Sequence, residues 1–173
     1  MRAVASKGKW AQGIRPRNFH WVIADRLAVC ERPGGHGQNH RNVRRQEEII
    51  WVREQGFTCV LSFFPAPHNL HHYDEMGVVW RHRPVPDDEL GVFEARFFPE
   101  LRTMLAAGER ILVHADELSD AVCGTIAGYL LWAGLIDGAP RTVNVIEQLT
   151  QRQLGPFGRE LVATALTLPP PPA

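Results

Sequence analysis

The hydrophobic residues of this chain fall into short apolar runs that alternate with longer segments of helical spacing. The runs FHWVIADRLAVC (19–30), FTCVLSF (57–63), VVWRHR (78–83) and ILV (111–113) predict strands, and the first splits at Asp25-Arg26 as a hairpin would. Helical spacing covers residues 43–55, 92–107, 122–135, 141–153 and 157–168, and a short helix is expected within 65–77. Pro99 falls inside the second of these helices and allows a kink or a break there.

Strands and helices that alternate along a chain predict an α/β fold, with a mainly parallel sheet and helices on both of its faces. We expect about four or five strands in that sheet. By this pattern residues 17–168 form a single domain, preceded by an N-terminal arm (1–16) and followed by a proline-rich tail (169–173). A length of 173 residues suits one domain with a substantial core.

The composition argues against several classes of function. Lys plus Arg is 19 and Asp plus Glu is 19, so no net charge favours nucleic acid or an anionic membrane as a partner. No apolar run reaches the roughly 18 residues of a membrane span, and the N-terminus lacks the apolar core of a secretory signal. Cys30, Cys59 and Cys123 have no CxxC spacing and predict free, buried thiols in a reducing compartment. We therefore expect a cytoplasmic protein.

One segment, ILVHADELSDAVCGTIAGYLLW (111–132), has the layout of a binding site: a strand, an acidic loop and an apolar helix. Asp116, Glu117 and Asp120 place three carboxylates at the start of the helix, where the helix dipole stabilises each by about 0.3–1 kcal/mol. Ser119 or Asp120 is a suitable N-cap for that helix. The simplest role for these residues is to cap their own helix. The alternative is a new ligand site, for a cation or an amine.

The order of these parts resembles the compact dual-specificity branch of the protein tyrosine phosphatase family. In that family the central strand ends in V-H-C-x-x-G-x-x-R-[ST]-G-T, and the next helix often contains A-A-Y-L. Aligned without gaps to LVHADELSDAVCGTIAGYL, His114 matches the motif histidine, and Ala127, Tyr129 and Leu130 match the helix. The segment PVPDDEL is similar to the general-acid loop and supplies Asp87, and NFHWVIADRLAVCERPG is similar to the opening hairpin. The resemblance covers residues 17–168.

The same resemblance implies that the catalytic core has been lost. Ala115 stands at the nucleophilic cysteine, Leu118 at the loop glycine and Ala121 at the phosphate-binding arginine. Loss of the nucleophile alone can cost about a million-fold in a comparable covalent enzyme. Leu118 also disfavours a turn with positive φ that glycine permits. The vestigial phosphate loop would comprise His114, Ala115, Asp116, Glu117, Leu118, Ser119, Asp120 and Ala121.

The function implied by the resemblance is that of a pseudophosphatase, a phosphatase-like domain without cysteine-dependent catalysis, with a binding or regulatory role and no cofactor. Its partner would be a protein or a small molecule at the degenerate pocket, and the sequence leaves the oligomeric state open. One alternative is an active hydrolase of the family with an altered mechanism, in which Asp87 remains the general acid. A second alternative is a metal-assisted hydrolase that uses His68 and His72, which are four residues apart. The resemblance implies that His114 hydrogen-bonds the backbone of the loop, and the simpler expectation is a core histidine with its hydrogen bonds satisfied.

Two further features have a functional and a structural explanation. The basic run that contains Arg32, Arg41, Arg44 and Arg45 can dock a phosphorylated partner or an anionic headgroup, but a solvated helix face is the simpler explanation. Cys123 follows the vacant arginine position. It lies in an apolar helix, which favours a buried inert thiol over a displaced nucleophile.

Overall fold

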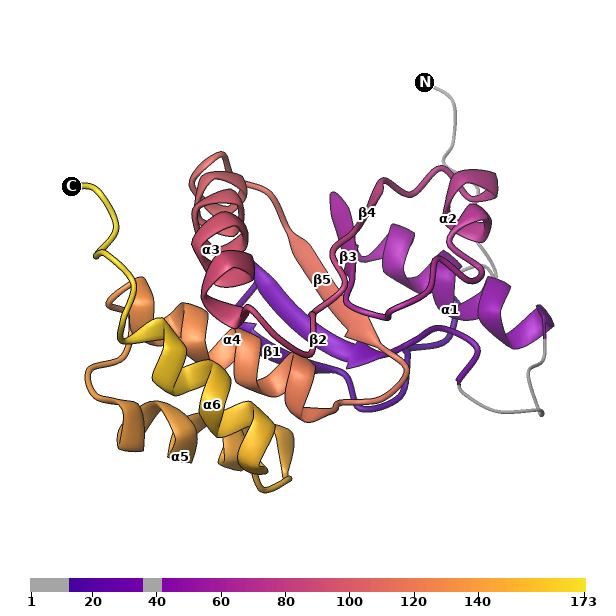
Figure 1. Cartoon of the computed structure of the whole chain (residues 1–173). Helices are drawn as coiled ribbons and strands as arrows, with labels where there is room; N and C mark the ends of the chain where they lie inside the picture. Colours follow the sequence, from indigo (N-terminus) through magenta and orange to yellow (C-terminus); the bar gives the residue numbers. More distant parts are fainter. Residues whose placement is uncertain (1–12, 36–41) are drawn as a thin grey trace.

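The computed structural model describes residues 13–35 and 42–173. A five-stranded sheet runs through the molecule in the order β1-β2-β5-β3-β4 (Figure 1). Its strands are β1 (His20–Ile23), β2 (Leu27–Glu31), β3 (Cys59–Ser62), β4 (Trp80–His82) and β5 (Ile111–Ala115). β1 and β2 form the predicted antiparallel hairpin, and the other neighbouring pairs are parallel. The predicted α/β fold with a mainly parallel sheet is confirmed.

Helices cover both faces of this sheet, as predicted (Figure 1). α1 (Asn42–Glu54) and α2 (His71–Glu75) lie on one side, and α3 (Leu90–Ala106), α4 (Asp120–Trp132), α5 (Ala139–Thr150) and α6 (Pro156–Ala165) lie on the other. Successive residues of a strand point to opposite faces, so Leu112 packs in the cluster beneath α1, whereas Ile111 and Val113 pack beneath α3 and α4. Burial on both faces explains why these strands are continuous apolar runs instead of alternating ones.

The helix that contains Pro99 is unbroken. α3 runs from Leu90 to Ala106 with Pro99 on its exposed side. A proline removes one backbone hydrogen bond, and on the solvent side water can satisfy the freed carbonyl. The break or kink that the sequence allowed is therefore not required, and α3 packs as a single element against the sheet.

The chain on either side of the predicted domain packs onto it. The Ile14 amide donates to the Glu47 carbonyl at 3.1 Å, which holds residues 13–16 against α1. At the other end the Trp132 indole at the end of α4 donates to the Pro169 carbonyl at 2.8 Å, and Arg102 of α3 donates to the Pro172 carbonyl at 2.8 Å, so the tail contacts both helices. Residues 1–12 of the predicted arm lie outside the described residues. Among the described helices, none combines the length and the apolar character that a bilayer crossing needs.

Candidate functional site

The loop between β5 and α4 lies at the carboxyl end of the central strand. In open α/β sheets ligands bind at this edge. β5 pairs with β2 on one side and with β3 on the other, and the five residues of the strand are buried. Residues 116–119 are therefore held at one end by the middle of the sheet and at the other by α4.

The apolar residues of this loop face the protein core. Ala115 and Leu118 are each 7% exposed, and both belong to the hydrophobic cluster on the α3 and α4 side of the sheet. The Ser119 amide donates to the Glu117 carbonyl at 2.8 Å, which closes a tight turn around Leu118. Residues 114–122, all of which the structure describes, have no positive φ. The loop thus accommodates leucine by taking a conformation that does not need glycine.

Asp116 turns from the loop toward the connection between β2 and α1. Its carboxylate lies 2.8 Å from the guanidinium of Arg32, and the Arg32 amide donates to the Ala115 carbonyl at 2.9 Å. The same guanidinium lies 4.9 Å from the centroid of the Phe64 ring. One carboxylate of the acidic loop is therefore already paired with a cation of this chain.

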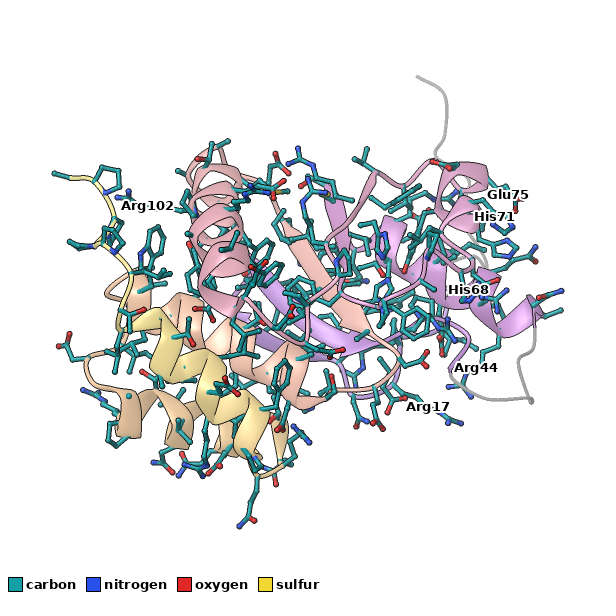
Figure 2. The ribbon with its side chains drawn as sticks, viewed as in Figure 1. Arg17, Arg44, His68, His71, Glu75 and Arg102 are labelled. Carbon is teal, nitrogen blue, oxygen red and sulfur yellow. The ribbon has the colours of Figure 1, made fainter. Side chains whose placement is uncertain are left out.

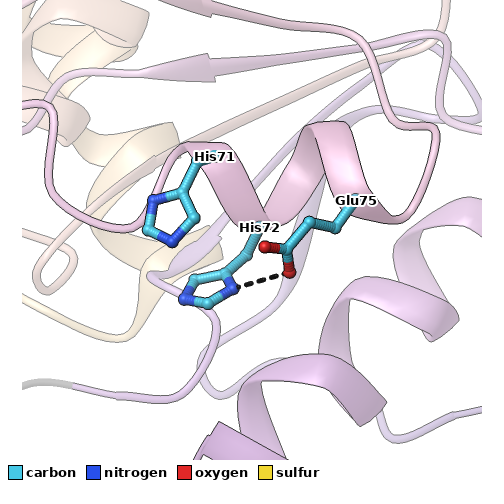
Figure 3. A group of neighbouring side chains, drawn as sticks. All are labelled: His71, His72 and Glu75. Carbon is cyan, nitrogen blue, oxygen red and sulfur yellow. Dashed lines mark hydrogen bonds and ion pairs between the residues drawn. The ribbon is translucent and has the colours of Figure 1, made fainter.

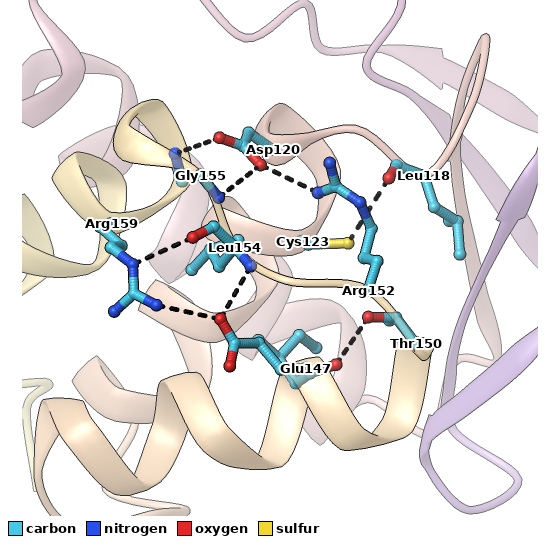
Figure 4. Close-up of polar contacts among 11 residues, drawn as sticks. Leu118, Asp120, Cys123, Glu147, Thr150, Arg152, Leu154, Gly155 and Arg159 are labelled. Carbon is cyan, nitrogen blue, oxygen red and sulfur yellow. Dashed lines mark hydrogen bonds and ion pairs between the residues drawn. The ribbon is translucent and has the colours of Figure 1, made fainter.

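Ser119 or Asp120 was predicted to be the N-cap of α4. Ser119 occupies the N-cap position but makes no side-chain cap hydrogen bond, and Asp120 is the first residue of the helix. The Asp120 carboxylate instead accepts hydrogen bonds from the amides of Gly155 at 3.0 Å (Figure 4) and Gly158 at 3.1 Å. Gly155 is the N-cap residue of α6 and Gly158 lies in its first turn, so Asp120 caps a helix that lies about 35 residues further along the chain.

Arg152 completes this contact, 2.9 Å from the Asp120 carboxylate (Figure 4). Burial alone would raise the pKa of Asp120, but the two amides and the guanidinium stabilise its charged form and hold the pKa below its usual value. The second acid of the loop is therefore ionised and fully engaged within the protein. Glu117 lies exposed between the two engaged acids.

His114 is completely buried at the end of β5. It is a core histidine, as expected, but its partner is a side chain and not the loop backbone: its Nε2 lies 2.9 Å from the hydroxyl of Tyr73 in α2. Burial, together with the nearby charge of Arg32, lowers the pKa of His114 to about 3, so the ring is neutral at physiological pH. Its Nδ1 has no hydrogen-bond partner among the described residues. His114 therefore fastens the strand to α2 without carrying charge.

Cys123 lies in the first turn of α4, after this loop, and it is 1% exposed. Burial raises its pKa despite the nearby guanidinium of Arg152, so the thiol is kept protonated. The three cysteines are free and buried, as predicted. The loop from residue 114 to residue 121 thus presents neither a thiolate nor a cation of its own.

Asp87 lies exposed in the connection between β4 and α3, and its side chain has no recorded hydrogen bond or ion pair to the residues that the structure describes. Its neighbours Asp88 and Glu89 line a cavity of about 380 Å³ together with Phe93 and Arg96. No residue of the 114–121 loop lines that cavity. This cavity therefore does not join Asp87, the predicted general acid, to the predicted phosphate loop, because neither lines it.

The basic run is only partly a solvated surface. Arg44 pairs with Glu48 at 2.8 Å, whereas Arg45 is 4% exposed and lies 3.1 Å from the Nε2 of His72. Arg41 lies outside the described residues. Arg45 is thus a buried partner of α2, which contradicts a solvated helix face for that residue. Binding of a partner by this run stays a prediction.

His68 and His72 were the metal-binding pair expected in the histidine-rich segment, but a different group of side chains converges there. Possible ligand atoms of His71, His72 and Glu75 lie within 4.8 Å of one another, and His68 does not belong to this group. His68 instead has its ring 6.1 Å from that of Phe64. His71 and Glu75 are exposed on α2 (Figure 2), and His72 lies beside them, partly buried against Arg45 of α1 (Figure 3).

Solved structures with the same architecture are phosphatases. A kinase associated phosphatase in which serine replaces the catalytic cysteine matches with a TM-score of 0.71 and 18% identity, over 85% of this chain and 92% of the other. The phosphatase Tk-PTP in its active form matches with a TM-score of 0.67 and 14% identity, over 86% and 95% of the two chains. The catalytic core of the PP-IP phosphatase SIW14 from S. cerevisiae, in complex with citrate, matches with a TM-score of 0.63 and 11% identity, over 87% of each chain.

These matches show that the chain has the α/β fold of the protein tyrosine and dual-specificity phosphatases, which confirms the fold implied by the resemblance. No protein-family model matches the sequence, and no curated protein is significantly similar to it. At these identities the likeness concerns the fold alone.

Proposed function

We propose that this protein is a pseudophosphatase: a domain with a phosphatase fold that lacks cysteine-dependent catalysis and acts by binding a protein or a small molecule. The observation that carries the proposal is the state of the loop between β5 and α4. Alanine is the last residue of the central strand, at position 115, and the acids on either side of the loop, Asp116 and Asp120, are bound to cations and amides of the chain itself.

The missing groups are those that the family chemistry requires. A cysteine phosphatase attacks phosphorus with a thiolate, and loop amides and the helix N-terminus stabilise both that thiolate and the phosphate oxygens. An arginine then binds two of those oxygens through parallel hydrogen bonds and stabilises charge in the transition state. With Ala115 and Ala121 at the corresponding positions, the chain has no nucleophile and no guanidinium from the loop.

The acids also change what the loop can bind. A carboxylate at Asp116 repels a phosphate dianion, and it already neutralises Arg32, the cation that would otherwise attract one. Asp120 is held by α6 and Arg152. We therefore propose that the loop excludes phosphate, and that a ligand of this edge of the sheet is recognised by other groups.

The test is to restore the missing groups and measure turnover. The variant Ala115→Cys/Leu118→Gly/Ala121→Arg is compared with wild type, and a control carries Ala115→Ser with the same two other changes. We expect aryl phosphate hydrolysis that vanadate inhibits in the restored variant, about a hundredfold or more over both comparison proteins. This is a small part of the roughly million-fold effect of a nucleophile. Because Leu118 is buried, the folded state of each variant is checked by circular dichroism.

A folded restored variant without activity would show that the positions do not correspond to those of the active enzymes. The same assay distinguishes the pseudophosphatase from the alternative, an active enzyme in which Asp87 is the general acid. If wild type hydrolyses the substrate and Asp87→Asn abolishes this activity, the protein is an enzyme with an altered mechanism and the pseudophosphatase proposal is wrong.

A further inference from the structure

We propose that α2 binds a divalent transition metal through His71, His72 and Glu75. Figure 3 shows the two imidazoles and the carboxylate side by side on one short helix. Their ligand atoms lie within 4.8 Å of one another, and the His72 Nδ1 is 3.2 Å from a carboxylate oxygen of Glu75. This site is separate from the loop after β5, and the inference does not depend on the proposed function.

The spacing of the three residues accounts for their convergence. Glu75 follows His72 by three positions and His71 by four, which places it on the helix face next to both. In a tetrahedral zinc site with metal–ligand distances of about 2.0–2.1 Å, the ligand atoms lie roughly 3.3 Å apart. His71 and Glu75 are exposed, so small side-chain rotations can bring their ligand atoms from 4.8 Å to that separation.

The chemistry of the ligand set indicates which ions bind. Imidazole nitrogens suit zinc, nickel, cobalt and copper, whereas magnesium and calcium prefer oxygen ligands. Two imidazoles and one carboxylate supply three ligands and leave a fourth position for water or another group. We therefore expect a single open site for zinc-like ions on this face of the molecule.

In the metal-free protein, Arg45 of α1 stabilises the tautomer of His72 that carries its proton on Nδ1 and therefore cannot bind a metal through that atom. Its Nη1 lies 3.1 Å from the Nε2 of His72, and a guanidinium can only donate, so the Nε2 accepts and the proton of the neutral ring is on Nδ1. That Nδ1–H then donates to Glu75. A metal that binds Nδ1 moves the ring proton to Nε2, where it would face the donor of Arg45.

Metal binding must therefore displace Arg45 from His72. The Nη1 of Arg45 has another acceptor within reach, the Oδ1 of Asn42 at 3.2 Å, so the displaced guanidinium keeps a hydrogen bond. Replacement of Arg45 by glutamine would supply an amide oxygen that accepts from the His72 Nε2–H. Such a second partner of a ligating histidine changes metal affinity by about 10–100-fold. Metal affinity should thus increase in Arg45→Gln, an effect that a nonspecific surface site would not show.

The experiment is a calorimetric titration of Zn²⁺ into the full chain, prepared without a histidine tag and treated with a chelator. Visible absorption of the Co²⁺ complex serves as a second readout. The chain has eight histidines, so variants decide the assignment. We compare wild type with His71→Ala, Glu75→Gln and Arg45→Gln, and use His68→Ala as the matched control, because His68 is exposed nearby but is not in the group.

We expect one equivalent of Zn²⁺ in wild type, binding at least about tenfold weaker in His71→Ala and in Glu75→Gln, unchanged binding in His68→Ala, and tighter binding in Arg45→Gln. His71 and Glu75 are exposed, so their variants keep the fold and the result is interpretable even if Arg45→Gln does not fold. Absence of stoichiometric binding, or equal affinity in wild type, His71→Ala and Glu75→Gln, would overturn the proposal. An equal loss in His68→Ala would do so too.

Discussion

Replacement of Glu94 by glutamine should remove a large pH dependence from the stability of this fold. Glu94 lies in α3 with no exposed surface, and neither of its carboxyl oxygens has a hydrogen-bond partner among the described residues. It fits against Gly128 of α4, where an added Cβ would lie 3.4 Å from Glu94 Oε1. Burial without a compensating charge raises the pKa of Glu94 to about 8.

The sign and size of the effect follow from linkage. Between the ordinary value of 4.5 and the folded value of about 8, the folded protein holds a proton on Glu94 that the unfolded chain has released. The stabilising contribution of this group is therefore complete below pH 4.5 and is lost as the pH rises to about 8. Each pH unit corresponds to about 1.4 kcal/mol, so the free energy of unfolding should fall by at most about 5 kcal/mol across this range.

The assay is urea unfolding of wild type and Glu94→Gln from about pH 5 to about pH 9. Wild type should lose stability with rising pH, while Glu94→Gln should be nearly level and more stable than wild type at the alkaline end. Glu160→Gln, on the exposed surface of α6, is the matched control and should follow wild type. Parallel profiles for wild type and Glu94→Gln would refute the reasoning.

Three other substitutions test the packing and charges around the loop. Asp120→Ala removes the acceptor of two α6 amides, and we expect a loss of about 2–4 kcal/mol in chemical denaturation. Because the folded pKa of Asp120 is lowered, its contribution is present above its ordinary pKa and lost as the pH falls through the folded value, so the variant should approach wild type in acid. Gly124→Ala would place a Cβ 2.6 Å from the Cα of Gly158 and should cost about 1–3 kcal/mol; an unchanged melting temperature would contradict this contact. Asp116→Asn releases Arg32 from its ion pair, so sulfate should bind measurably to the variant and not to wild type, as followed by NMR titration.

The elements of the fold could be predicted because their signals are local. The runs around Val60 and Val113 are apolar on both faces, which is typical of strands in the middle of a parallel sheet, and the nearly uniform apolarity of α4 indicated its burial. The burial of Glu94 also had a local signal, since Phe97, three residues on, is a core residue of the same helix.

The partners of the site residues could not be predicted in the same way. Asp120 has the residue type and position of an N-cap, but Gly155, Gly158 and Arg152 reach it from elsewhere in the chain. Similarly, Tyr73 binds His114 across 41 positions, and nothing in the sequence near either residue indicates the contact. Side-chain partners depend on how the helices are placed on the sheet, which periodicity does not specify.

We propose that the loop after β5 supports no cysteine-dependent phosphatase chemistry. The most direct measurement is steady-state hydrolysis of an aryl phosphate by purified wild-type protein, with and without vanadate. We predict a rate equal to that of buffer and no effect of vanadate, because Ala115 and Ala121 provide neither the nucleophile nor the guanidinium. Turnover that is proportional to protein concentration and inhibited by vanadate would contradict the account.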